Sequence, residues 1–453
     1  MSSSSRKSAP SAQSRAAESG GKSLAAKPLK VAIAGLGTVG GGTVKLLQTN
    51  AELLAKRTGR GIRITAVSDR YRHDHGFPVD DYIWYDDAVK MAGDADAEVV
   101  VELIGGAEGA AKQVCETAIA AGRHVVTANK ALIAHHGMRL AAAAEQRGVS
   151  LAYEAAVAGG IPIVKALREG LVGNRRGRIF GILNGTCNYI LTAMRETRRE
   201  FEAVLAEAQA LGYAEADASF DVDGIDTAHK LAILATVAFG CTLDFAALHI
   251  EGIRHVSPVD IAFAEELGYR IKLLGIASLT DGEVERRVHP CMVPMGAPVA
   301  RVDGVFNAVV AHGDFVDRIV QEGRGAGERP TASAVVADLA DIACGRRTPI
   351  FGIPVGDLQP LPALPMSRHR GAYYVRLMVL DQPGVLADVT SILRDNAVSV
   401  EAVLQRSRAP GAAVPVVMTT HDTEEAAMIR SLERIGALPS CIEPPRMIRI
   451  EPV

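Results

Sequence analysis

Two charged residues one helical turn apart are the clearest candidates for proton chemistry in this sequence. Residues 227–239 have the composition of a helix, and a spacing of four places Asp226 and Lys230 on the same helix face. Apolar residues follow Lys230, so we expect its ammonium group to be partly withdrawn from water and to serve in proton transfer. The alternative is a surface salt bridge, which would contribute only about 0.3–0.5 kcal/mol.

A second lysine, Lys130, comes just after an apolar segment, residues 124–127, that predicts a strand. Ligands of parallel sheets bind beyond the carboxyl ends of the strands, so we expect Lys130 to point toward a cofactor crevice. An exposed loop lysine is the alternative.

The elements that would position these groups begin with a glycine-rich turn. Apolar residues 30–34 lead into G-L-G-T-V-G at 35–40, and a helical pattern follows. This order is typical of a dinucleotide-binding Rossmann domain. The first glycine permits a tight turn, the second lets the backbone approach a pyrophosphate, and the third lets helix and strand pack closely. The helix N-terminus offers N–H groups to phosphate. The expected cofactor-binding residues here are Gly35, Gly37, Thr38, Val39 and Gly40.

The cofactor could be NAD or NADP. The second predicted strand, residues 62–67, ends near Asp69 and Arg70, where a Rossmann domain meets the adenosine ribose. A carboxylate there accepts hydrogen bonds from a ribose 2′-hydroxyl and favours NAD, whereas an arginine can pair with a 2′-phosphate and favours NADP. The sequence supplies both, so the preference stays open, with Arg70 as the candidate phosphate contact.

Composition excludes several other classes of protein. The chain has 453 residues, which predicts about two to four domains. A formal charge of -3 gives no basic field for nucleic acid or membrane binding. The six cysteines are scattered singly and the twelve histidines form no HExxH pattern, so we assign no disulfide or side-chain metal site and expect a cytoplasmic location. Residues 1–27 are expected to be a disordered tail, with a transit peptide as the alternative.

Several motifs carry a resemblance to a known enzyme family. They are G-L-G-T-V-G at 35–40, A-N-K at 128–130, L-N-G-T-C-N-Y at 183–189 and G-Y-A-E-A-D at 212–217, continuing through Asp226 and Lys230. Over about residues 30–350 the chain resembles homoserine dehydrogenases. The resemblance implies NADPH- or NADH-dependent interconversion of L-aspartate 4-semialdehyde and L-homoserine, in the biosynthesis of threonine, methionine and isoleucine.

The expected architecture is α/β with three folded domains. A Rossmann domain covers residues 28–157, with a returning segment at about 320–350. An α+β catalytic and dimerisation domain covers 158–319, and a linker at 351–371 precedes the C-terminal domain.

The resemblance also implies residue roles. Lys230 would be the proton donor, Lys130 would lie beside cofactor and substrate, and Glu215 would hold the substrate ammonium. A homodimer or homotetramer is implied as well. The further residues implied are Gly185, Thr186, Tyr213 and Asp226 for the amino-acid substrate, Gly327 for the cofactor, and the backbone oxygens of Glu154, Val157, Gly159 and Ile161 for a structural sodium ion.

Residues 372–453 predict a strand–helix–strand–strand–helix–strand order, the ferredoxin-like arrangement. With D-Q-P-G at 381–384 in the first strand-to-helix turn, this segment resembles an ACT domain, a module that commonly binds amino acids. Because homoserine leads toward threonine, we expect L-threonine to inhibit by binding near Asp381, Gly384 and Asn396. The alternative is a dimerisation or packing domain without a ligand.

Two other functions remain open at this stage. One is a Rossmann oxidoreductase that acts on a different small aldehyde or hydroxy acid with the same two lysines. The other is a regulatory module that senses a nucleotide and an amino acid.

Overall fold

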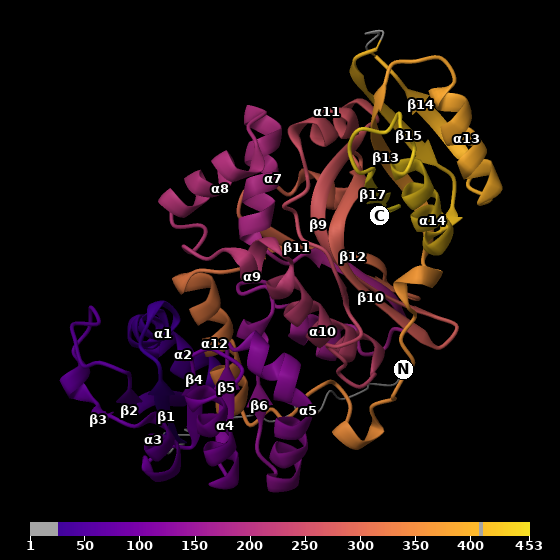
Figure 1. Ribbon diagram of the computed structural model, residues 1–453. Coiled ribbons are helices and arrows are strands. Elements are labelled where there is room, and N and C mark those ends of the chain that lie inside the picture. Colours follow the sequence, from indigo (N-terminus) through magenta and orange to yellow (C-terminus); the bar gives the residue numbers. More distant parts are fainter. Residues whose placement is uncertain (1–25, 407–410) are drawn as a thin grey trace, which may run out of the picture.

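The computed structural model describes residues 26–406 and 411–453, which form two sheets with helices packed against them (Figure 1). Residues 1–25 of the expected tail lie outside the described residues. The last two residues of that tail, Ala26 and Lys27, instead belong to the first strand, because Ala26 pairs with Arg60 of the second strand. Within the described ranges no helix is long and apolar enough to span a membrane.

The first sheet is the doubly wound parallel sheet that the sequence predicts. Its strands run in the order β3-β2-β1-β4-β5-β6, and every neighbouring pair is parallel. The central strands are mostly apolar because helices cover both faces. The elements are β1 (Ala26–Ala34), β2 (Arg60–Ser68), β3 (Ile83–Tyr85), β4 (Val99–Glu102), β5 (His124–Thr127), β6 (Leu151–Ala152), α1 (Thr38–Thr49), α2 (Ala51–Thr58), α3 (Ala88–Asp94), α4 (Ala110–Ala120) and α5 (Lys130–Arg147).

One strand is shorter than expected. Residues 151–157 predict a strand, but β6 ends at Ala152 and Glu154–Ala156 form a 3₁₀ turn. The buried Glu154 carboxylate accepts a hydrogen bond of 2.9 Å from the backbone N–H of Val164. This bond draws the chain away from the sheet and into the next helix.

Helix α12 (Glu328–Ala343) brings the chain back to the first sheet, and Figure 1 shows it beside α1. The two helices approach closely because Gly42 lacks a side chain: a Cβ there would lie 2.6 Å from Glu328 Cγ. Val335 and Leu339 of α12 complete the hydrophobic core on that face.

The second sheet has 11 strands and carries both the catalytic and the C-terminal segments. Helix α10 lies against it through apolar residues such as Leu231, which pack with Leu273 and Val288 of the long antiparallel pair β9–β10. The catalytic elements are α6 (Ile163–Lys165), β7 (Arg176–Ile182), α7 (Gly185–Thr197), α8 (Phe201–Ala210), α9 (Ser219–Val222), α10 (Ile225–Phe239), β8 (His249–Ile250), α11 (Pro258–Glu266), β9 (Tyr269–Thr280), β10 (Glu283–Pro294), β11 (Phe306–Gly313) and β12 (Asp317–Arg324).

The C-terminal segment has the predicted ferredoxin-like order, with its strands arranged β17-β13-β15-β14. Helices α13 and α14 cover one face, where Tyr373, Val389 and Met428 are buried together. The elements are β13 (Arg370–Leu380), α13 (Val385–Asp395), β14 (Val400–Leu404), β15 (Ala413–Thr420), β16 (Thr423–Glu424), α14 (Glu425–Gly436) and β17 (Arg446–Ile450).

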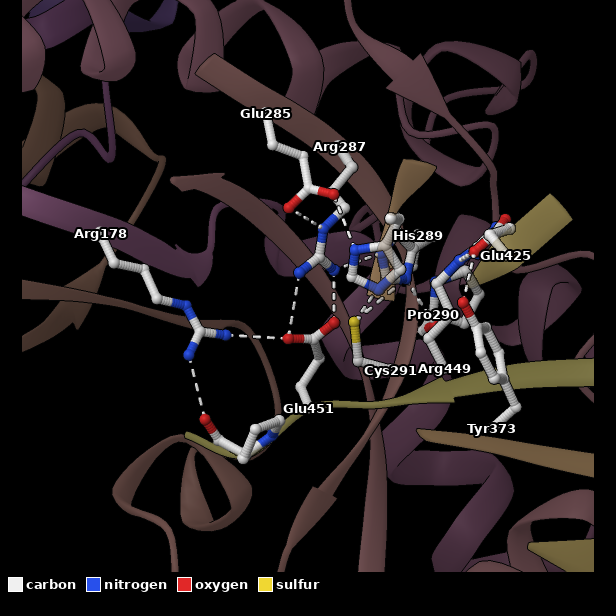
Figure 2. A network of polar contacts seen from close by, with 12 residues as sticks. Arg178, Glu285, Arg287, His289, Pro290, Cys291, Tyr373, Glu425, Arg449 and Glu451 are labelled. Atoms are coloured by element: carbon white, nitrogen blue, oxygen red, sulfur yellow. Dashed lines mark hydrogen bonds and ion pairs between the residues drawn. The ribbon is translucent and has the colours of Figure 1, made fainter. Parts of the chain in front are cut away.

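The C-terminal module is continuous with the catalytic sheet rather than separated from it by the linker. Strand β17 pairs with β10 on one side and β13 on the other. A largely buried ionic network crosses this junction, and we call it the domain seam: Arg178, Glu251, Glu285, Arg287, Glu425, Arg449 and Glu451. Figure 2 labels all of these residues except Glu251.

Three side chains beside Arg287 of the domain seam have ligand atoms close enough to hold a metal ion. Atoms of His289, Cys291 and Glu451 all lie within 4.8 Å of one another, and all three residues are buried. Arg287 ion-pairs with Glu451, and its Nη1 lies 2.8 Å from His289 Nε2. The guanidinium thus already supplies the positive charge at this position.

Candidate functional site

An open cleft of about 510 Å³ lies between the glycine turn of the first sheet and the catalytic helices. Residues from segments far apart in the sequence meet in it. Of the residues expected from the sequence, the cleft brings together Val39, Lys130, Gly159, Gly185, Thr186, Tyr213, Asp226, Lys230 and Gly327.

A buried carboxylate stands between the two lysines. Asp226 Oδ2 lies 2.7 Å from Lys230 Nζ, and Asp226 Oδ1 lies 3.1 Å from Lys130 Nζ. Burial would raise the pKa of the Asp226 carboxyl, but Lys230 and Lys130 outweigh it and hold this pKa well below its usual range. The alternative of a surface salt bridge is wrong, because the Asp226 and Lys230 side chains are only 5% and 9% exposed.

Lys230 is fixed by the end of β7 as well as by Asp226. Its Nζ donates a hydrogen bond of 2.6 Å to the Leu183 carbonyl. An ammonium has three N–H donors. Two of them are used by Leu183 and Asp226, so within the described chain a third is left for a substrate oxygen in the cleft.

Lys130 is the first residue of α5. Asn129 caps the helix by accepting a hydrogen bond of 3.0 Å from the Leu132 N–H, and its own amide donates to the Gly106 carbonyl at 2.6 Å. The Lys130 side chain is about a third exposed, and its Nζ lies 5.4 Å from the centre of the Phe220 ring. Lys130 and Lys230 therefore both line the cleft, and each contacts a different oxygen of Asp226.

Two residues that sequence reasoning did not assign adjoin Asp226: Asn184, in the loop before α7, and Asp221, in α9. Asn184 caps α7 and donates through Nδ2 to both Asp221 Oδ1 and Asp226 Oδ2, each at 2.8 Å. Burial, and next the charge of Asp226, raise the pKa of the Asp221 carboxyl. The five acids at 215–226 were a visible signal for Asp221, and Asn184 directly precedes the Gly185–Thr186 pair.

A third residue that the sequence did not mark is Asn307, which is buried beside Gly185 and Gly325 in the wall of the cleft. It is the second residue of β11, and no spacing pattern distinguishes it.

Glu215, the expected ammonium ligand, is not in the cleft. It is exposed in the loop after α8, and the carbonyls of Glu215 and Ala216 both accept hydrogen bonds of 3.1 Å from Gln209. These bonds hold this part of the loop on α8. Tyr213, two residues earlier, does line the cleft.

The glycine turn has the geometry that phosphate binding needs. Gly35 adopts φ +93°, and a Cβ there would lie 2.6 Å from the Leu103 carbonyl oxygen. Gly37 has open space where a side chain would be, at the start of α1. A Cβ on Gly40 would lie 2.0 Å from the carbonyl oxygen of Gly35, the residue directly after β1, so a side chain there would push α1 away from the end of that strand.

The end of β2 lies beside this turn, since the Gly35 N–H donates to the Ser68 carbonyl at 2.8 Å. Arg70 is exposed there, and its side chain has no ion-pair partner among the residues that the structure describes. Arg72 is engaged elsewhere, because it pairs with Asp80 and lies over the Trp84 ring.

The loop that would supply the sodium ligands is tightly bent. Ala158 and Gly159 both have positive φ, +54° and +45°. The Glu154 and Ile161 carbonyls each accept one backbone hydrogen bond, from Val157 and Ile163. The carbonyls of Val157 and Gly159 accept none from the described residues, so the four oxygens fit a small cation by their chemistry.

The three residues expected at the regulatory site do not converge. Gly384 precedes the first residue of α13 and Asn396 follows its last. At 1.5 Å per residue the helix separates them by about 18 Å, so one small ligand cannot touch both within a chain. Asn396 instead caps its own helix by donating to the Ile392 carbonyl at 2.9 Å.

A Rossmann sheet with an open glycine turn, joined to a cleft with two lysines and a carboxylate, defines a nicotinamide-dependent oxidoreductase. The family model described as "Homoserine dehydrogenase, NAD binding domain" matches residues 35–154, and that described as "Homoserine dehydrogenase" matches 162–340. The chain belongs to the homoserine dehydrogenase family, and an ACT domain model matches residues 373–439.

Relatives match over nearly the whole chain. The homoserine dehydrogenase of Pseudomonas aeruginosa is 46% identical over 94% of this chain and 99% of its own length, and that of Neisseria gonorrhoeae is 44% identical over the same shares. The crystal structure of a homoserine dehydrogenase from Thiobacillus denitrificans has a TM-score of 0.88 and 44% identity, covering 94% of this chain and 98% of that one. A hyperthermophilic archaeal homoserine dehydrogenase in complex with NADPH has a TM-score of 0.60 and 26% identity, covering 71% of this chain and 99% of that one.

Proposed function

We propose that this chain interconverts L-aspartate 4-semialdehyde and L-homoserine, with Lys230 as the proton donor to the aldehyde oxygen. The observation that carries the proposal is the buried Asp226, which holds Lys230 and Lys130 in one cleft beside the glycine turn. The bound nicotinamide supplies the hydride.

The chain's own residues have separable tasks in this proposal. Lys230 presents its remaining N–H to the oxygen that gains negative charge as the aldehyde is reduced. Asp226 keeps both lysines oriented and balances part of their charge. Lys130 would lie beside cofactor and substrate, and Thr186 and Tyr213, which also line the cleft, would contact the substrate.

Initial rates with the purified full-length chain test this function directly. We expect reduction of L-aspartate 4-semialdehyde and oxidation of L-homoserine. Turnover of another small hydroxy acid but of neither of these would favour the alternative oxidoreductase.

The cofactor preference is proposed to depend on Arg70, and the NADPH complex of the archaeal relative supports a phosphate-bearing cofactor in that family. Arg70→Ala should raise KM for NADPH about tenfold and KM for NADH less than about twofold, because only NADPH loses a charge-assisted contact. Steady-state kinetics with both cofactors measure this. Arg72→Ala is the matched control, since that arginine is already paired with Asp80. Equal effects of Arg70→Ala on both cofactors would contradict the assignment.

We further propose that backbone oxygens of Glu154, Val157, Gly159 and Ile161 bind a sodium ion that stabilises the bent loop. Support comes from the two carbonyls without amide partners described above. We also propose a homodimer or homotetramer, supported by exposed apolar side chains at the edge of the second sheet: Phe306, Phe315, Val316 and Val320.

Feedback inhibition by L-threonine is proposed from the ACT domain match, with the ligand carboxylate at the N-terminus of α13. We expect millimolar L-threonine to inhibit the intact chain. Gly384→Asp should raise the inhibitory concentration about tenfold, because a carboxylate at this helix end repels that of the ligand. Gly384→Asn is the control, because asparagine must adopt the same φ of +100° as aspartate but carries no charge.

Inhibition assays at several threonine concentrations measure this effect. Full activity at millimolar threonine would contradict the sensor role and leave the dehydrogenase unaffected. Deleting the whole module is not a suitable test, because it would remove β17 from the catalytic sheet and expose Arg287.

A further inference from the structure

A histidine pair connects the two helices that carry the lysines. His229 precedes Lys230 on α10, and His135 lies on α5, the helix that begins with Lys130. Their Nε2 atoms are 3.0 Å apart, so one ring donates a hydrogen bond and the other accepts it. This contact joins the nucleotide-binding part of the chain to the catalytic part.

Aromatic rings enclose the buried side of this pair. The His229 ring is only 4% exposed and stacks on Phe245, with centroids 4.6 Å apart and planes 12° apart. It also stacks on Phe220, at 5.5 Å and 27°. The His229 ring therefore packs against two phenylalanine rings as well as against His135.

The same Phe220 ring borders Lys130. Lys130 Nζ lies 5.4 Å from the ring centre, within the range of a cation–π contact, and 3.1 Å from Asp226 Oδ1. His229 thus reaches Lys130 by two routes: through Phe220, and through His135 on the lysine's own helix. His229 itself is not among the residues that line the cleft.

We infer that His229 is a positioning residue that fixes Lys130 against Asp226 across the two parts of the chain. The inference rests on the role proposed above for Lys130. Misplacing a reactive group by about 1 Å can cost up to about a hundredfold in rate. We therefore expect His229→Leu, which removes the hydrogen bond and the stacking, to lower kcat on the order of tenfold.

The test is a double-mutant cycle in the full-length chain. If His229 acts through Lys130, His229→Leu should lower kcat in the wild-type background but change it less than about twofold in a Lys130→Met background. The Kd for NADPH, measured by fluorescence, should differ by less than about twofold between wild type and His229→Leu. His229→Gln, whose amide can still meet His135, should recover part of the lost kcat.

His312→Leu is the matched control, because that histidine stacks on Phe180 in the second sheet and touches neither helix. It should leave kcat unchanged. If the kcat losses of His229→Leu and Lys130→Met multiply in the double variant, the two residues act independently and the positioning role is overturned. The role is also overturned if His229→Gln recovers none of the lost kcat while its melting temperature is unchanged. An unaltered kcat in Lys130→Met alone would instead remove the proposed role of Lys130 itself.

Discussion

Replacing Lys230 with methionine is expected to lower kcat by a factor on the order of 10² or more while NADPH binding persists. Methionine keeps the apolar stem but removes the ammonium that donates to Leu183 and points its remaining N–H at the cleft. The glycine turn that receives the cofactor is formed by other elements and stays intact. Steady-state kinetics together with a fluorescence titration of NADPH separate these two effects.

Lys272→Met provides the matched control for this variant. Lys272 is also a buried lysine, with Nζ 2.6 Å from the Val302 carbonyl and 3.0 Å from Asp303, but it lies outside the cleft. Its loss should lower stability and leave kcat per folded molecule unchanged. A Lys230→Met enzyme with normal kcat would show that Lys230 is only the structural partner of Asp226.

The sequence was sufficient for the parts of the site that depend on local geometry. A helix places residues four apart on one face, so the Asp226–Lys230 pair could be derived from spacing alone. The glycine turn could be derived because only glycine fits a φ of +93° beside the Leu103 carbonyl. The ferredoxin-like order was also predictable, because each of its strands and helices is separated by a clear turn.

Other features depend on how loops, helices and strands are arranged in space, which residue spacing does not show. Nothing in residues 446–450 indicates that they pair with β10 as well as β13, so the C-terminal module looked independent of the catalytic sheet. Glu215 is exposed in a loop that bonds back to α8: the Gln209 side chain donates hydrogen bonds to the carbonyls of Glu215 and Ala216. Asn396 shared a sequence neighbourhood with Gly384, but a whole helix separates them.

The second large effect is expected at the domain seam, where Arg449→Met should lower the free energy of unfolding by about 3–5 kcal/mol. Arg449 is 2% exposed, and its guanidinium donates to Glu425 at 2.8 Å and twice to Glu251 at 2.9 Å. Methionine fills much of the same volume but, among the residues that the structure describes, leaves the buried Glu425 carboxylate with only the Tyr373 hydroxyl, 3.2 Å away. An uncompensated buried charge is what makes the loss of one partner so costly.

Urea denaturation of the full-length chain measures this loss, with Arg346→Met as the matched control. Arg346 pairs with Asp341 at 2.9 Å but is 67% exposed, and exposed pairs contribute about 0–1 kcal/mol. Adding Glu425→Gln to Arg449→Met should recover part of the stability, because the remaining group is then neutral.

A loss for Arg449→Met no larger than for Arg346→Met would mean that β17 is held by its strand pairing and apolar packing rather than by the charges of the domain seam. If the large loss is found, the C-terminal module and the catalytic sheet should also unfold together in a single transition, since both depend on the same arginine.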